Sequence, residues 1–295
     1  MSEDFFTRRE AHDRGLTDSG IRSGVRSGRL TRLRPGALTD SAHFSALTAA
    51  AQYRVRVRAA ADASAAPVVV SHLSAAALHA LPVLRPDYSR IHLTMDGSGG
   101  GRVGPRTLHR VRLDPREVTI VDGLAVTTLA RTAVDTACMG TFEQAVCVVE
   151  SALRAGAERD ELHAALSRIG KRRGISVARR ACAFADPRTE SIGESWSRAM
   201  MTRWRDVPQP RLQHRFVTDD GRFVARTDFD WDGLLVGEFD GVTKYVSTEV
   251  MVDEKRREDA LRLLGIHVIR WTWSDLLNPE RFHRILRTGL ERAGL

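Results

Sequence analysis

The residues best suited to chemistry are carboxylates that alternate with apolar residues in the segment Arg226–Tyr245. Two strand-like stretches of this segment flank Trp231-Asp232-Gly233, where the glycine allows the positive φ that a tight turn requires. The pattern therefore predicts a β-hairpin with its loop at 231–233. Because strand residues of equal parity share a face, this register makes Asp228 and Glu238 diagonal neighbours, within roughly 7 Å of each other.

Carboxylates that crowd on a covered sheet face repel one another and lose hydration. Asp230 and, if the strand continues, Asp240 would join Asp228 and Glu238 on that face. Each unpaired charge would cost several kcal/mol or shift its pKa, and a bound cation would remove that cost. Oxygen ligands with no Cys or His nearby favour Mg²⁺ or Mn²⁺. The alternative is a surface hairpin in which Asp230 and Asp232 serve as turn residues.

Helices and further strands must position this hairpin. A helix over about Glu190–Trp204 precedes it, and within that helix Glu194 has the apolar neighbours Ile192 and Trp196, which indicates partial burial. A long charged helix over Thr248–Leu264 follows the hairpin. With strands at 212–217 and 266–271, the predicted order is α-β-β-β-α-β.

These residues resemble the PD-(D/E)XK nuclease superfamily, near the very-short-patch-repair endonucleases, from about Asp186 to Leu277. The similar segments are Thr189-Glu-Ser-Ile-Gly-Glu-Ser195, Val236-Gly-Glu-Phe-Asp-Gly-Val-Thr-Lys-Tyr245, Glu254-Lys-Arg-Arg-Glu-Asp259 and Val268-Ile-Arg-Trp-Thr-Trp273. The resemblance implies an α/β restriction-endonuclease-like fold and Mg²⁺-dependent hydrolysis of DNA. It implies that Asp228 and Glu238 ligate the metal, with Glu194 completing the site and Asp240 assisting.

The chain departs from the family motif at Asp240, where the motif has lysine two residues after the glutamate. Only three of the 45 basic residues are lysines, and two of them, Lys244 and Lys255, lie in the nuclease-like segment. Lysine is a compact charge with a pKa that can shift, whereas arginine is a planar fork that stays charged. One of these two lysines, with Lys255 favoured, is therefore expected to supply the missing ammonium. The alternative is two ordinary surface lysines.

The N-terminal region is basic and contains no acidic residue between Ser19 and Leu38. Two short helices, the second capped by Thr17 and ended by Gly28, precede an alternating segment that ends at Pro35-Gly36. This arrangement resembles a winged helix-turn-helix, which implies a helix in the DNA major groove and a wing on phosphates. The predicted DNA-binding residues are Arg22, Arg26, Arg29, Arg32 and Arg34. The alternative is a helical docking module with a solvated arginine face.

In the middle region, Asp96–Gly101 is predicted to be a linker, Val118–Val126 a single strand and Lys171–Arg173 a solvated helix start that could contact phosphate. Its histidines, His72, His79, His92 and His109, show no metal-ligand spacing and are predicted to be packing or surface residues. Two segments, Ser71–Leu81 and Val126–Val134, resemble the AbiEi-type antitoxins together with the N-terminal module, over about 8–155. The resemblance implies an autoregulator of a type IV toxin–antitoxin system and a cognate toxin as partner.

Composition sets few limits. The 295 residues contain 45 Lys and Arg against 37 Asp and Glu, for a net charge of +8 and a pI near 10.2, which permits a polyanionic partner. Three scattered cysteines indicate no disulfide framework. No apolar run reaches about 18 residues and the first residues are not basic, so neither a membrane span nor a signal peptide is predicted and the cytoplasm is expected.

The sequence as a whole predicts a multidomain α+β protein. Its expected units are a winged helix-turn-helix over 1–62, an antitoxin-like α+β domain with a helical connector over 63–185, and the nuclease-like domain over 186–295. The favoured function is a metal-dependent DNA endonuclease in a toxin–antitoxin or defence context. The alternative is a non-catalytic, DNA-binding transcriptional regulator that keeps the nuclease fold as a scaffold.

Overall fold

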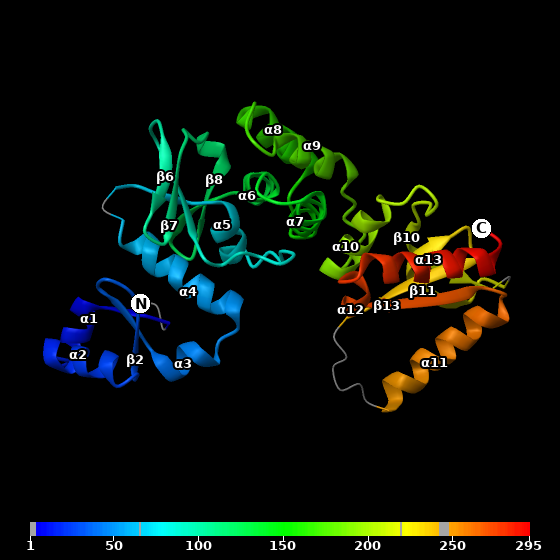
Figure 1. Cartoon of the computed structure of the whole chain (residues 1–295), viewed down its shortest axis with the longest axis horizontal. Helices are drawn as coiled ribbons and strands as arrows, with labels where there is room; N and C mark the ends of the chain where they lie inside the picture. The colour runs from blue at the N-terminus through cyan, green and yellow to red at the C-terminus, as the bar shows by residue number, and fades with distance from the viewer. Residues whose placement is uncertain (1–3, 65, 219, 242–247) are drawn as a thin grey trace.

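The computed structural model describes residues 4–64, 66–218, 220–241 and 248–295, with only the helical backbone for 248–255 (Figure 1). Within these ranges the chain is a mixed α+β structure with separate sheets of three, six and four strands. The predicted α+β class is confirmed at that level. Among the described helices, none combines the length and the apolar character needed to cross a membrane.

The first unit is a small sheet with short helices around it. Its elements are β1 (Phe6–Thr7), α1 (Arg8–Asp13), α2 (Asp18–Arg26), β2 (Leu30–Arg34), β3 (Ala37–Asp40) and α3 (Ser41–Ala46), and the strand order is β1-β3-β2. Thr7 starts α1 with a capping box, since its hydroxyl accepts from the Glu10 N–H and the Glu10 carboxylate accepts from the Thr7 N–H. Ala11, Ile21 and Leu38 form its core.

Helix α4 (Ala49–Asp62) packs mainly on the next unit, although the expected domain boundary after residue 62 assigns it to the first one. Tyr53 and Val57 of α4 are fully buried in a core shared with the middle sheet. The Tyr53 hydroxyl lies 2.7 Å from Ser74 Oγ and donates to the Arg90 carbonyl oxygen at 2.7 Å. The helix therefore attaches the N-terminal unit to the middle one.

The middle unit is a six-stranded sheet covered by helices. The strands are β4 (Val69–Val70), β5 (Ile91–Met95), β6 (Gly100–Val103), β7 (Arg106–Arg110), β8 (Val118–Val121) and β9 (Leu124–Thr127), in the order β6-β7-β5-β4-β9-β8. The helices are α5 (His72–Leu78), α6 (Leu129–Ala137), α7 (Phe142–Arg154), α8 (Arg159–Ile169) and α9 (Ile175–Phe184), with a 3-10 turn at Pro115–Glu117.

Two predictions for this unit are wrong. The segment Val118–Val126 is a hairpin, not one strand, because Asp122 and Gly123 adopt φ of 51° and 79° and reverse the chain. The glycine-rich Asp96–Gly101 segment is not only a linker, since Gly100 opens strand β6, which pairs antiparallel with β7.

The C-terminal unit has the predicted order α-β-β-β-α-β, followed by two more helices. Its elements are α10 (Ile192–Met201), β10 (Arg211–Val217), β11 (Phe223–Trp231), β12 (Leu235–Asp240), α11 (Thr248–Leu263), β13 (His267–Thr272), α12 (Trp273–Leu276) and α13 (Pro279–Ala293). The sheet order is β10-β11-β12-β13, with β12 and β13 parallel. Apolar residues of α10, α12 and α13 fill one face, while Leu261 of α11 packs with Val236 and Ile266 on the other (Figure 1).

The hairpin register differs from the predicted one. Trp231 pairs with Leu235 and Phe229 with Gly237, so the loop is 232–234 instead of 231–233. Each paired residue of β11 therefore pairs with a residue of β12 two positions later than predicted. Asp232 as well as Gly233 has positive φ, at 53° and 73°. Asp228 and Glu238 therefore occupy directly opposed positions instead of diagonal ones.

Candidate active site

Two carboxylates of the C-terminal unit share one amide donor. Gln213 Nε2 lies 3.0 Å from Glu194 Oε2 and 3.2 Å from Asp228 Oδ1, so this side chain joins α10 to the hairpin. Glu194 is buried, and Asp228 is half-buried. Gln213 itself has φ of 52°, a conformation that costs a non-glycine residue of order 1–3 kcal/mol and that occurs preferentially at functional sites.

Helix α10 approaches the sheet closely enough to bring Glu194 to this point. Ser191 caps the helix by accepting from the Glu194 N–H, and the Glu194 carboxylate accepts from the Glu190 N–H at 2.8 Å. Gly193 makes the close approach possible, because a Cβ there would lie 1.9 Å from the Phe239 ring. The short apolar-flanked helix start thus positions a carboxylate over the hairpin.

Asp228 lies where strands β11 and β12 stop pairing. The last paired residues are Phe229 and Gly237, and beyond them Asp228 Oδ2 accepts from the Phe239 N–H at 3.0 Å. Burial raises the pKa of Asp228 despite this hydrogen bond and that from Gln213. Burial, and then the charge of Asp228, raise the pKa of Glu194. No Lys or Arg in the described ranges forms an ion pair with either carboxylate.

Glu238 is in a different environment from Asp228. Arg257 Nη2, from α11, lies 2.9 Å from both of its carboxylate oxygens, and Arg270 Nη2, from the neighbouring strand, lies 3.0 Å from Oε2. Arg257 also lowers the pKa of Asp228 through its charge, although burial dominates there. Two guanidinium groups therefore compensate the buried Glu238 charge.

The predicted site residues are brought together only in part. A metal site with three ligands needs three ligand atoms close together. In the described part of the chain, the carboxylate oxygens of Asp228, Glu238 and Glu194 do not all lie within 4.8 Å of one another. Asp230 does not join them as predicted, because it accepts from Arg211 Nε at 2.6 Å and from the Gly233 N–H at 2.9 Å. Asp230 therefore acts as a turn residue of the hairpin, the role that the alternative to a metal site gives it.

The remaining predicted residues of this site lie at its margin or outside the description. Asp240 is 45% exposed and pairs with Arg270 at 3.5 Å. Lys244 lies outside the described residues, and Lys255 lies on the α11 backbone with its side chain outside the description. Sequence reasoning missed Gln213, Arg257 and Arg270. Arg257 could have been found, because it lies in the motif Glu254-Lys-Arg-Arg that carries the resemblance.

The N-terminal unit presents most of the predicted DNA-binding arginines. Arg22, Arg26 and Arg29 of and after α2 are exposed, as is Arg32 on β2, and none forms an ion pair in the described ranges. Arg22 and Arg32 together line a hollow of about 330 Å³. The exposed residues Arg22, Arg26, Arg29 and Arg32 are together termed the basic surface of the N-terminal unit.

Arg34 does not belong to that surface. Its Nε donates to the Ala59 carbonyl oxygen, its Nη1 donates to the Pro35 carbonyl oxygen at 2.7 Å, and its Nη2 lies 3.6 Å from Asp62. The side chain therefore fixes the hairpin to α4. These contacts engage the Arg34 guanidinium within the protein and disfavour a contact with DNA, which stays a prediction.

The middle unit contains a histidine cluster that the sequence spacing did not indicate. His72, His92 and His109 have ring nitrogens within 4.8 Å of one another. His72 and His92 are buried, as the prediction of packing residues expects, but the spacing gave no sign that the three rings meet. The predicted helix start at Lys171–Arg173 is wrong, because these residues form a loop before α9 and Arg172 reaches Asp135 at 2.9 Å.

Comparisons with known proteins give relatives without an assigned activity. No protein-family model matches the chain. Two Mycobacterium tuberculosis sequences, named uncharacterized protein MT2308 and uncharacterized protein Rv2248, are each 31% identical over 176 residues, 59% of this chain. The match spans 64% of the relatives' length, just under two thirds. The crystal structure of the Rv2827c protein from Mycobacterium tuberculosis aligns with a TM-score of 0.41 and 15% identity, over 73% of this chain and 84% of that one.

Proposed function

We propose that the protein binds DNA through its N-terminal unit and hydrolyses phosphodiester bonds at the carboxylates of its C-terminal unit, with Mg²⁺ or Mn²⁺ as cofactor. The observation that carries this proposal is the pair Glu194 and Asp228. Glu194 is buried and Asp228 is half-buried, both accept from Gln213, and neither forms an ion pair with a cation in the described chain. A hard divalent cation suits such a pair, because it compensates two charges with oxygen ligands.

The topology supports the nuclease-like part of the proposal. The order α10-β10-β11-β12-α11-β13 matches the order expected from the PD-(D/E)XK resemblance. The capped helix α2, the β2–β3 hairpin and their exposed arginines support a winged helix-turn-helix for the N-terminal unit. We extend the proposal to an antitoxin-like role of the middle unit, in a toxin–antitoxin or defence context.

Each residue near the carboxylates has a specific task in this proposal. Glu194 and Asp228 would hold the cation, and Gln213 orients both carboxylates through its amide. Glu238, whose charge Arg257 and Arg270 compensate, would be a third ligand. These two arginines, with Lys244 and Lys255 as further candidates, would provide the positive charge that the family motif has at the position of Asp240. When bound, Mg²⁺ supplies a more acidic water and neutralises charge on the phosphate.

The arginines around Glu238 favour a second candidate. A carboxylate held by two guanidinium groups needs no metal to be stable, so the cluster also suits a scaffold without chemistry of its own. In this candidate the chain is a DNA-binding transcriptional regulator of the type IV antitoxin kind, with a cognate toxin as its partner. Metal binding distinguishes the two.

The charge of Asp228 should lower the stability of the protein when no metal is bound. Without metal, Asp228→Asn should raise the midpoint of thermal unfolding at neutral pH, because it removes a charge that burial disfavours. A carboxyl with a raised pKa binds its proton more tightly in the folded state, so the wild type should regain this stability as pH falls through that pKa. The variant's advantage should therefore disappear in acid. Scanning calorimetry of both proteins, from neutral pH to a pH below the pKa of Asp228, measures the difference between their unfolding midpoints.

The same variant tests the cofactor. Saturating Mg²⁺ should stabilise the wild type, by about 2.7 kcal/mol at 100 times the dissociation constant, and should stabilise Asp228→Asn much less. Asp232→Asn is the matched control, because it removes an exposed carboxylate from the same hairpin and asparagine tolerates positive φ. Titration calorimetry that shows no heat with millimolar Mg²⁺ or Mn²⁺ would support the regulator instead.

DNA affinity should depend on the basic surface of the N-terminal unit. Replacing Arg22, Arg26 and Arg29 with alanine should weaken binding and reduce the slope of log affinity against log salt by about 1 for each phosphate that is no longer neutralised. Fluorescence anisotropy with a labelled duplex at several salt concentrations measures this slope. A control with Arg179, Arg284 and Arg292 replaced by alanine has the same charge change on other exposed surfaces. Equal slopes for both triple variants would place DNA elsewhere.

A further inference from the structure

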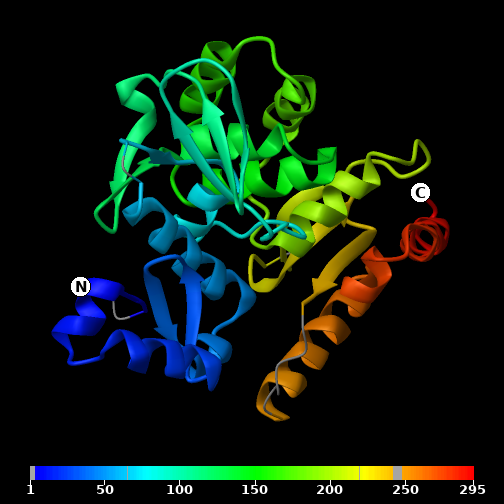
Figure 2. The same cartoon turned by 60° about the vertical axis from the view of Figure 1, so that its left-hand side comes forward.

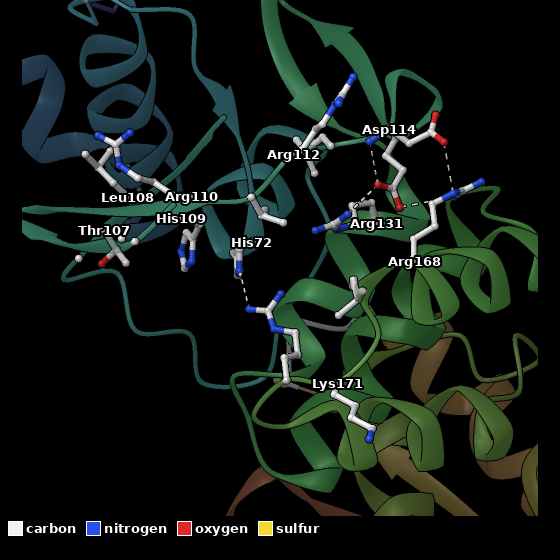
Figure 3. A pocket seen from close by; sticks show the side chains of 18 of the residues that line it. His72, Thr107, Leu108, His109, Arg110, Arg112, Asp114, Arg131, Arg168 and Lys171 are labelled. Carbon is white, nitrogen blue, oxygen red and sulfur yellow. Dashed lines mark hydrogen bonds and ion pairs between the residues drawn. The ribbon is translucent and has the colours of Figure 1, made fainter. Parts of the chain in front are cut away.

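The largest cavity among those described lies in the middle unit, away from the carboxylates proposed for catalysis. Its volume is about 840 Å³, within the range of small-molecule sites. Residues of α5, β6, β7, the chain after β7, α6 and the loop between α8 and α9 line it (Figure 3). The apolar side chains Leu108, Leu113 and Ile169 form part of the wall, beside strongly cationic ones.

The lining carries more positive than negative charge. Its cationic residues are Arg110, Arg112, Arg131, Arg168, Lys171 and Arg172, whereas Asp114 and Glu117 are the acidic ones. Three of these cations are already engaged within the protein, because Arg131, Arg168 and Arg172 contact Glu117, Asp114 or the buried Asp135.

Three cations of this lining have no carboxylate within ion-pair distance in the part of the chain that is described: Arg110, Arg112 and Lys171. All three are exposed. Figure 3 shows Arg112 and Lys171 on opposite sides of His72. The cavity therefore has an excess of cations that are available to a ligand with several negative charges.

Two histidines, His72 and His109, form a planar and polar part of the wall, and His92 lies beside them outside the lining. The rings of His72 and His109 stack with centroids 3.7 Å apart, and His92 Nδ1 lies 3.0 Å from His109 Nε2. Burial lowers the pKa of His92 and of His109 to about 4, and lowers that of His72 further below its ordinary value. At neutral pH these imidazoles are uncharged and offer hydrogen bonds without repelling the nearby arginines.

Two contacts disfavour a metal ion among these three rings. Stacked rings direct their lone pairs along parallel planes, so His72 and His109 do not point at one central ion. His72 Nδ1 lies 2.9 Å from Ser71 Oγ, and Arg172 Nη2 lies 3.5 Å from His72 Nε2, which puts a guanidinium where a cation would be repelled. His72 also holds φ of 52°, so its position is maintained at a cost of order 1–3 kcal/mol.

We infer that this cavity binds a free nucleotide, with its phosphate groups on the unpaired cations at the rim and its base against the apolar and imidazole wall. Arginine clusters recognise phosphate because the guanidinium fork matches its oxygens. The volume is larger than inorganic phosphate requires, and the apolar residues beside the cations suit a ligand with a flat organic part. A bound nucleotide would therefore stabilise the folded middle unit.

Titration calorimetry of the full chain with ADP and GDP tests this inference, with adenosine and inorganic phosphate as partial ligands. At least one nucleotide should bind, and both partial ligands should bind more weakly. The double variant Arg110→Gln/Lys171→Gln should lose at least about tenfold in affinity, roughly 1.4 kcal/mol. These exposed substitutions should change stability by less than about 0.5 kcal/mol, so a folding defect does not obscure the result.

The matched control is Arg173→Gln/Arg179→Gln, which removes the same charge from exposed positions that do not line the cavity. It should bind nucleotide like the wild type. Three results would overturn the inference: no binding of either nucleotide at millimolar concentration, equal losses in both double variants, or phosphate binding as tight as nucleotide binding. Stabilisation by Zn²⁺ alone that is lost in His109→Asn would identify the cluster as a metal site instead.

Discussion

Replacing Arg131 with methionine should lower the free energy of unfolding by about 3–5 kcal/mol, the usual cost of removing one partner from a buried ion pair. Arg131 Nη1 lies 2.6 Å from Glu117, and its Nε lies 2.8 Å from Asp135. All three side chains are at most 4% exposed, so the substitution would leave two buried carboxylates short of charge compensation. Denaturant unfolding monitored by circular dichroism measures the loss.

Two further variants separate charge from packing in this network. Arg168→Met should cost less than about 1 kcal/mol, because Arg168 is 35% exposed and its contacts to Asp114 and Glu117 are 3.5 Å long. Adding Glu117→Gln and Asp135→Asn to Arg131→Met should restore part of the stability, since it removes the uncompensated charges. If the triple variant is less stable than Arg131→Met, shape rather than charge determines the effect.

The second large effect should appear in catalysis. Asp228→Asn should reduce metal-dependent DNA cleavage at least about 100-fold, or roughly 2.7 kcal/mol of transition-state stabilisation, while leaving DNA affinity nearly unchanged. The reason is that Asp228 lies at the carboxylate pair and not on the basic surface of the N-terminal unit. Rates of plasmid nicking and anisotropy on the same preparation measure the two quantities.

Asp232→Asn, on the exposed turn of the same hairpin, should cleave like the wild type. The triple arginine variant of α2 should show the reverse pattern, with weakened binding and a cleavage rate that recovers at saturating protein. Both views of the molecule place the N-terminal unit and α11 below the middle unit (Figure 1 and Figure 2). If Asp228→Asn loses cleavage only because it loses binding, its role is in recognition.

The order of elements in the C-terminal unit could be predicted because each boundary has a local signal. Ser191 caps α10, Asp232-Gly233 makes the hairpin turn and Gly265 ends α11. The register could not be predicted, because it depends on whether one or two loop residues take positive φ. Because the register differs from the predicted one by two residues, an even number, Asp228 and Glu238 stay on the same face and become directly opposed instead of diagonal.

The contacts that define the sites could not be predicted, because they depend on long-range pairing. Gln213 is an isolated polar residue in a strand, and only the β10–β11 register places it beside Asp228. The histidine cluster requires β5 and β7 to lie parallel, which periodicity does not indicate. By contrast, the missed hairpin at Asp122-Gly123 had a local signal, since aspartate followed by glycine between apolar residues favours a tight turn.

Incubation of supercoiled plasmid with the full chain tests the proposed function most directly, in Mg²⁺, in Mn²⁺ and in chelator, beside Asp228→Asn and Glu238→Ala. We expect nicking or linearisation by the wild type with a divalent ion, none in chelator, and at least about a 100-fold slower reaction with Asp228→Asn. A wild-type protein that binds DNA yet leaves it intact with both ions would contradict the nuclease assignment. Cleavage that continues at the wild-type rate in Asp228→Asn would contradict the assignment of the site.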